Sequence, residues 1–282
     1  GAACRDDQAT TAGGGIVRLD LGSGNLVLNG IIESNGDDTS YLTGAGGSVY
    51  IQAGQISGVG TISARGGDTA SLHEHGGGGR IAMYFNSLSG FNIENQVSAR
   101  GGFNTRSAAA GTIYYKDLDN DTDGHLLINN SGTSGALGKY SVSLLAAPSQ
   151  STDSTIISNT LTTGTSLLQH NVDTGHLKGF YLNPDMDENS TQTFSDDTLF
   201  KISNHAANTL QTDSSLTSIA SSGDKYSVIS KFDSLVIKNN SNFWMESPII
   251  AGSVLVDDSD INFKSKRTHL SLYSTGIITV QN

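Results

Sequence analysis

Three aspartates at alternate positions give this chain its clearest chemical signature. They lie in the hexapeptide DNDTDG, residues 119–124. Alternate carboxylates in a tight turn that ends in glycine supply hard oxygen ligands at positions 1, 3 and 5 of a calcium loop. Position 12 is Asn130 instead of a bidentate glutamate, so a further ligand would come from Asp117, a main-chain carbonyl or a neighbouring turn. We predict a structural calcium site at Asp119, Asp121 and Asp123; the simpler alternative is a solvated acidic turn.

Two other segments carry potential metal ligands in weaker patterns. Residues 185–189 read Asp-Met-Asp-Glu-Asn and lack the glycine that gives a calcium loop its sharp turn. His73 and His75 flank Glu74 in a glycine-rich loop, where a spacing of two residues provides no fixed helical face for a transition metal. We interpret both segments as exposed loops.

Tyrosines on one predicted strand face are candidates for contact with glycans. Tyr50, Ala82 and Tyr114 occupy one column of the sequence repeat described below, and Tyr84 stands near them. Aromatic rings on a sheet face stack against sugar rings, but they also stabilise sheets by packing across strands. Both interpretations stay open, and the candidate contacts are Tyr50, Tyr84 and Tyr114.

No pattern typical of an enzyme active site is present. The sequence contains no nucleophile motif, no phosphate-binding glycine loop and no Cys/His spacing of a zinc site. Glu33, Glu94 and Glu188 are too scattered to nominate as a catalytic pair. We predict a protein without catalytic residues. A polysaccharide lyase or hydrolase is the alternative, because parallel β-helices host such enzymes; this is an analogy of fold.

A repeat of 32 residues must position these side chains. Gly15, Gly47, Gly79 and Gly111 are spaced identically, and an apolar or aromatic residue follows each glycine two and four positions later. The two columns are Val17, Val49, Ile81 and Ile113, and Leu19, Ile51, Met83 and Tyr115. A period of this size is typical of one supersecondary unit stacked on copies of itself. Parallel strands about 4.8 Å apart would place Val49 between Val17 and Ile81.

The repeat predicts an all-β fold, a parallel β-helix (β-solenoid) with an inserted irregular β-rich module. Residues 13–130 form the glycine-rich solenoid. Residues 139–227 lose the period but keep short strand-like alternations between polar turns. Residues 234–282 regain a repeat and form a second, truncated solenoid segment with coils of about 18 residues. Asn and Asp recur at its turns, where they tolerate left-handed conformations.

Composition and charge limit the class of protein. The chain has 282 residues, a net charge of −11 and a pI near 4.8, and such an acidic surface repels nucleic acid and anionic membranes. No run of about 18 apolar residues is present, so no membrane insertion is expected. Cys4 is the only cysteine, which excludes an internal disulfide. Arg65 and Arg100 repeat at matched positions, and we expect them to pair with acidic neighbours.

Three segments resemble the glycine-rich repeats of large bacterial cell-surface and adhesin-like proteins. These are residues 46–51 (GGSVYI), 56–64 (ISGVGTISA) and 76–82 (GGGGRIA). Residues 200–204 together with 223–226 are similar to a β-rich module of the same giant proteins. The resemblance implies a parallel β-helix on the bacterial exterior and supplies no catalytic residues.

We therefore expect an extended structural or adhesive segment of a large secreted or cell-surface bacterial protein, extracellular or at the cell surface in location. Its expected partners are other segments of the same protein and surface glycans. A carbohydrate-binding module is a further alternative.

Overall fold

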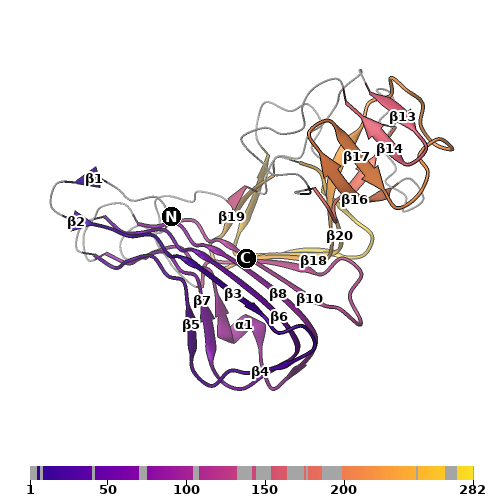
Figure 1. The fold of residues 1–282 in the computed structure, drawn as a ribbon. Coiled ribbons are helices and arrows are strands. Elements are labelled where there is room, and N and C mark those ends of the chain that lie inside the picture. Colours follow the sequence, from indigo (N-terminus) through magenta and orange to yellow (C-terminus); the bar gives the residue numbers. More distant parts are fainter. Residues whose placement is uncertain are drawn as a thin grey trace.

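Nearly all of the regular secondary structure in the described part of the chain is β-strand (Figure 1). The computed structural model describes residues 5–6, 9–39, 42–69, 75–103, 108–131, 142–143, 154–163, 175, 177–185, 199–245, 247–263 and 272–281. One helical turn, α1 (Ile93–Gln96), follows Asn92, whose side chain accepts a hydrogen bond from the Asn95 amide. The all-β prediction is confirmed. Within the described residues, no helix has the length and apolar character needed to cross a membrane.

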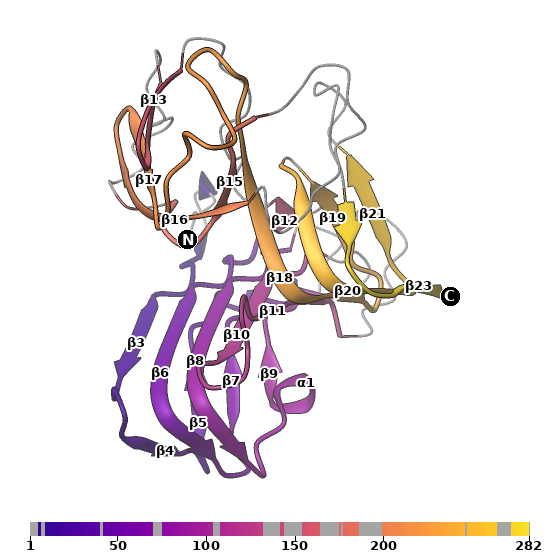
Figure 2. The same cartoon turned by 90° about the vertical axis from the view of Figure 1, so that its right-hand side faces the viewer.

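The repeat units alternate between two parallel sheets, which Figure 2 shows in the lower half of the molecule. The strands of the larger sheet in this region are β3 (Ile16–Asp20), β4 (Asn25–Val27), β6 (Ser48–Ser57), β8 (Arg80–Ser89) and β10 (Thr112–Asp117). The smaller sheet contains β5 (Ile31–Glu33), β7 (Thr61–Ser63) and β9 (Val97–Ser98). We call these eight strands the stack. A hairpin of β1 (Arg5–Asp6) and β2 (Ala9–Thr10) precedes them.

The predicted register of the repeat is confirmed. Val49 pairs in parallel with Val17 on β3 and with Ile81 on β8, and Ile81 pairs with Ile113 on β10. Alternate residues of β6 point inward, so Val49 and Ile51 are only 2% and 0% exposed. Since one coil alone buries little apolar surface, the strands are stable only when neighbouring coils share this core.

The chain reverses after β10, which corrects the expectation of a purely parallel arrangement. β10 pairs antiparallel with β11 (His125–Asn129). Residues 118–124 between them form a tight turn, in which the Asp117 carboxylate accepts hydrogen bonds from two following amides and Gly124 has a φ of +74°. Asp and Gly in these roles favour a hairpin connection, whereas a parallel step needs a longer crossover. The large sheet is therefore mixed.

β11 continues into a second set of parallel strands. The larger-sheet strands are β18 (Ser227–Lys238), β20 (Ile249–Asp257), β22 (Leu272–Ser274) and β23 (Ile278–Gln281). Beside them lie β12 (Val142–Ser143), β19 (Asn242–Met245) and β21 (Asp260–Phe263). The predicted short repeat is confirmed here: Asn242 pairs with Asp260, 18 residues later. The turn residues Asn240 and Asp258 have positive φ values of 58° and 45°, as predicted for Asn and Asp at this position.

Antiparallel strands form a separate module, at the upper right of Figure 1. They are β13 (Thr155–Ile157), β14 (Thr160–Thr162), β15 (Tyr181–Asn183), β16 (Phe200–Ala206) and β17 (Thr209–Thr212). Leu161, Leu182 and Leu210 are fully buried in its core. The first residues of β18 pair antiparallel with β15 and its last residues pair parallel with β11, so one strand joins the antiparallel module to the stack. The predicted segment limits at 227 and 234 fall within that strand.

Candidate functional site

The three aspartates of the predicted calcium loop lie in the turn between β10 and β11. Asp119 is exposed, whereas Asp123 is buried. Their carboxylates have different hydrogen-bond partners: Asp119 accepts from Asn86 Nδ2 at 2.7 Å, Asp121 from the Asp117 amide at 2.7 Å, and Asp123 from the Tyr181 hydroxyl at 2.6 Å. The calcium site stays a prediction.

Asp121 also belongs to a tighter cluster with His125 and Asp233. One potential ligand atom of each residue lies within 4.8 Å of the other two. His125 Nε2 lies 3.2 Å from Asp121 Oδ1, and its Nδ1 lies 2.7 Å from Ser234 Oγ. One imidazole nitrogen with two carboxylates suits a transition metal, whereas calcium takes oxygen ligands. Because each of the three side chains already has a protein partner, hydrogen bonding explains the cluster equally well.

A divalent cation in this hairpin is expected to raise the melting temperature through Asp121, which belongs to both ligand sets. The measurement is the shift between thermal melts with calcium and with chelator. At a calcium concentration about 100-fold above the dissociation constant, the stabilisation is about 2.7 kcal/mol, and Asp121→Ala should remove it. Asp119→Ala removes a calcium-induced shift if the predicted loop binds the ion, and keeps a zinc-induced shift if the cluster does. A wild-type melt that neither calcium nor zinc shifts would refute both sites.

The weaker ligand candidates lie largely outside the described residues. This is the case for His73, Glu74 and residues 186–189. His75 is described, and burial lowers the pKa of its imidazole, so the ring is neutral near pH 7.

The three candidate tyrosines form one continuous aromatic row with Phe232. The ring centroids of Tyr50 and Tyr84 lie 5.5 Å apart, and those of Tyr84 and Tyr114 lie 5.6 Å apart. Phe232 on β18 continues the row at 6.4 Å from Tyr114. The Arg18 guanidinium lies 4.6 Å from the centre of the Tyr50 ring and engages that end of the row. Contact between the predicted tyrosines is therefore established, and contact with a glycan stays a prediction.

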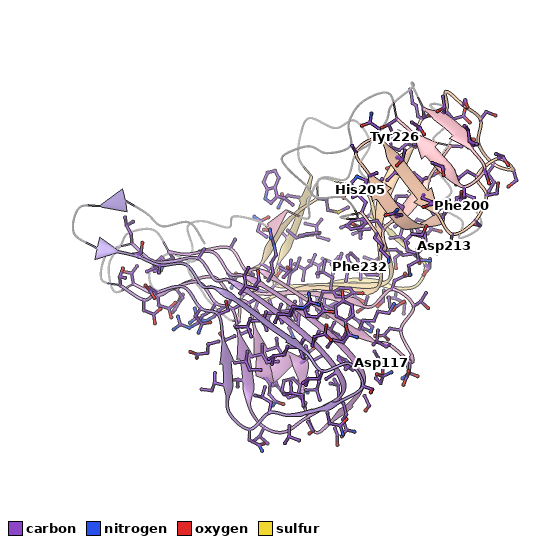
Figure 3. All side chains as sticks on the ribbon, viewed as in Figure 1. Asp117, Phe200, His205, Asp213, Tyr226 and Phe232 are labelled. Atoms are coloured by element: carbon purple, nitrogen blue, oxygen red, sulfur yellow. The ribbon has the colours of Figure 1, made fainter. Side chains whose placement is uncertain are left out.

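Tyr84 and Tyr114 line a cavity between the stack and the antiparallel module. Its volume is about 480 Å³, within the range of small-molecule sites. The walls come from β8, β10, the β10–β11 turn, β11, residues 178–180, β16 and β18. Figure 3 shows Phe232, another lining residue, at the level where the stack and the module meet. The cavity therefore depends on segments that are far apart in the sequence.

Asp123 is the buried carboxylate of this cavity, with a side chain only 4% exposed. Its Oδ1 accepts the hydrogen bond from the Tyr181 hydroxyl, whereas its Oδ2 has no hydrogen-bond donor among the described residues. Asp233 fixes the main chain here, because its Oδ2 accepts from the amides of Asp123 at 2.9 Å and Gly124 at 2.7 Å. A buried carboxylate oxygen without a donor is unfavourable. Oδ2 thus keeps an unused capacity to accept a hydrogen bond.

Lysines surround the Asp123 carboxylate. The Nζ atoms of Lys201 and Lys231 lie 3.9 Å and 3.7 Å from its oxygens. The same ammonium groups lie 5.6 Å and 5.1 Å from the centre of the Tyr181 ring, within cation–π range. Two further lysines line the cavity, Lys116 and Lys178. The lining of the cavity therefore contains four lysines and one carboxylate, in a chain whose net charge is −11.

The two tyrosines of the cavity are neutral hydrogen-bonding groups. Burial raises the pKa of the Tyr114 hydroxyl far above its ordinary value, and Tyr84 and Asp123 raise it further. Burial also raises the pKa of Tyr84. Tyr114 therefore stays protonated and donates to the Asp123 main-chain oxygen at 2.9 Å. A tyrosine with a raised pKa is a poor general base at neutral pH.

Sequence reasoning identified the aromatic side of the cavity and missed its charged side. Tyr181 and Lys201 come from the segment without a repeat, and Lys231 precedes the short repeat. No spacing in the sequence links them to Asp123, because they reach it only through the pairing of β11 with β18 and of β18 with β15.

Comparison with known proteins gives no family model, no curated protein and no solved structure that matches this chain. The class of protein is therefore defined by geometry alone. It is a mixed β-sheet protein with a stack of parallel strands and a cavity that is both aromatic and cationic.

Proposed function

We propose that this chain is a β-solenoid segment that serves as an extended structural and adhesive module of a large secreted or cell-surface bacterial protein. The main observation that supports this proposal is the constant register of the stack, which repeats the same inward and outward columns on β3, β6, β8 and β10. Such a stack makes an elongated scaffold with a continuous outer surface. The acidic charge suits an extracellular protein and disfavours nucleic acid as a partner.

Further β-segments of the same large protein are the first proposed partner. At the β3 edge of the stack, Ile16, Val27 and Ile31 are 84%, 67% and 66% exposed. At the opposite edge, Ile277 immediately precedes β23 and is 73% exposed, and Val280 lies within β23 and is 71% exposed. Edge strands with unpaired backbone groups accept additional strands. These apolar edges support continued stacking at both ends.

Surface glycans are the second proposed partner, through the aromatic row. Tyr84, Tyr114 and Phe232 are half-buried, so part of each side chain stays accessible, and all three line the cavity. Aromatic walls with a few well-placed polar groups are the usual composition of a small-molecule site. This arrangement supports carbohydrate binding as the adhesive activity of the scaffold.

A polysaccharide lyase or hydrolase is the alternative function. The observation in its favour is the group of Lys201, Lys231 and Tyr181 around the Asp123 carboxylate. We propose binding without turnover. Glycoside hydrolysis ordinarily uses two carboxyl groups that flank the scissile bond. Among the described residues, Asp123 is the one carboxylate that lines the cavity.

Polysaccharide retention combined with a product assay tests this function. The chain is run by affinity electrophoresis through gels that each contain one polysaccharide, and the same polysaccharides are assayed for new reducing or unsaturated ends. We expect retention without product, and weaker retention for Tyr84→Ala. Tyr273→Ala is the control, because Tyr273 is 39% exposed and lies outside the aromatic row. Product formation that Asp123→Asn abolishes would overturn the non-catalytic proposal, and no retention in any gel would overturn the adhesive one.

A further inference from the structure

We propose that the cavity binds an acidic saccharide, a pyranose that carries a carboxylate. This inference rests on the proposed glycan-binding function and names its ligand class. Three features of the cavity match three parts of such a ligand: lysines match the carboxylate, aromatic rings match the apolar face of the pyranose, and a buried acceptor matches a hydroxyl.

The lysines favour a negatively charged group. Lys201 Nζ lies 3.9 Å from the nearest Asp123 oxygen, which is too long for a hydrogen bond, so this ion pair does not saturate its donors. The Lys201 side chain is 40% exposed, and Lys178 is also exposed. Both ammonium groups are thus accessible to a ligand carboxylate. Their surplus of positive charge is local, since the chain as a whole is strongly acidic.

The aromatic side of the cavity favours a ring over a simple anion. Tyr84, Tyr114 and Phe232 lie in consecutive contact and are tilted by 55° and 58° to one another, which makes a curved wall and not a flat plate. The C–H face of a pyranose packs against such a wall. Inorganic sulfate or phosphate would leave these rings without a contact.

Asp123 adds the requirement for a hydroxyl donor. Its Oδ2 is buried and lacks a hydrogen-bond donor among the described residues. An ionised carboxylate only accepts hydrogen bonds, so the ligand group that faces it must donate. A saccharide hydroxyl satisfies this need, whereas a second carboxylate at this position would be repelled. A ligand that is anionic at one end and hydroxylated at the other therefore fits the charge pattern of the cavity.

Trigalacturonic acid and its methyl ester are the probes, titrated calorimetrically into the full chain. The ester keeps the ring and its hydroxyls but removes the charge. We expect the acid to bind at least about tenfold more tightly than the ester, as one charge-assisted hydrogen bond would give. Added salt should weaken binding of the acid more than that of the ester.

Variants locate the binding in the cavity. Lys201→Met removes the ammonium group and keeps the aliphatic stem; it should weaken binding of the acid by about tenfold and leave the ester unchanged. Tyr84→Leu should weaken both ligands. Lys225→Met, outside the cavity, should change neither. Melting temperatures equal to that of the wild type show that the variants fold. If Lys201→Met does not fold, Lys178→Met takes its place, because Lys178 is exposed.

The outcomes separate this inference from the function on which it rests. Equal affinities for acid and ester, or binding of neutral or sulfated saccharides alone on a glycan array, would overturn the carboxylate preference and leave glycan adhesion intact. If the acid binds but neither cavity variant weakens its binding, the inference is also overturned, because the binding site then lies outside the cavity. Failure of every saccharide to bind would overturn the adhesive function itself.

Discussion

Replacing Gly79 by valine is expected to lower the free energy of unfolding by about 2–4 kcal/mol, several times the effect of an ordinary surface substitution. A Cβ atom on Gly79 would lie 2.1 Å from the carbonyl oxygen of Gly47 on the neighbouring coil. That oxygen accepts a hydrogen bond from the Arg80 amide at 2.9 Å, so it is fixed in the strand ladder. Gly79 has no positive φ, and the requirement for glycine is therefore the close approach of two coils.

Gly15 provides the matched control for this prediction. It occupies the same column of the repeat, but a Cβ atom there meets nothing within 4 Å, because it lies at the edge of the stack. Gly15→Val should change the free energy of unfolding by less than about 0.5 kcal/mol. Urea unfolding followed by circular dichroism measures both variants. Equal midpoints for Gly79→Val and Gly15→Val would show that the glycine column is not needed for packing.

Asp68→Asn is expected to lower the free energy of unfolding by about 1–2 kcal/mol at pH 7, because it breaks a ladder of charged groups that links three coils. Asp68 accepts hydrogen bonds from both terminal nitrogens of Arg100, at 2.9 Å and 2.7 Å, and from Arg65 at 3.1 Å. Arg65 also donates to both oxygens of Asp38, each at 2.8 Å. The predicted pairing of the two repeated arginines with acidic neighbours is thus confirmed. The expected loss of stability is modest because the Asp68 side chain is 34% exposed, so solvent screens its ion pairs.

The same substitution should reduce the sensitivity of the protein to acid. Burial opposes ionisation of Asp68, but hydrogen bonds from Arg100 and from the Phe103 amide outweigh it and lower the pKa of the carboxyl. The hydrogen bond from Arg65 likewise lowers the pKa of Asp38. A carboxyl whose pKa is lower in the folded state stabilises the fold above the unfolded pKa, and this contribution is lost as the pH falls below about 4.

Chemical unfolding of wild type and Asp68→Asn at a series of pH values between 7 and the acid limit of folding measures this effect. Wild type should lose stability more steeply below about pH 4 than the variant. Asp20→Asn is the control, since the Arg18–Asp20 pair is 65% and 46% exposed and should contribute little. Identical pH profiles for wild type and Asp68→Asn would show that the ladder does not couple ionisation to folding.

The sequence by itself determined the repeat, its register and its inward columns. Alternation of apolar residues and a constant distance between glycines are properties of the local chain, and parallel stacking follows when each unit can bury its apolar face only against a copy of itself. Val49 and Ile81 therefore pair as predicted. The left-handed turns at Asn240 and Asp258 also follow from residue type alone.

Only the tertiary structure decided where the chain reverses and which residues form the cavity. The acidic turn after Asp117 does not by itself show that the chain reverses there; β10 and β11 form a hairpin, and β11 pairs in parallel with β18, more than a hundred residues later. That pairing brings Lys231 to Asp123, and the adjacent β15 and β16 bring Tyr181 and Lys201. A period predicts contacts between copies of one unit. Contacts between segments that do not repeat depend on the packing of the whole chain, so no spacing in the sequence encodes them.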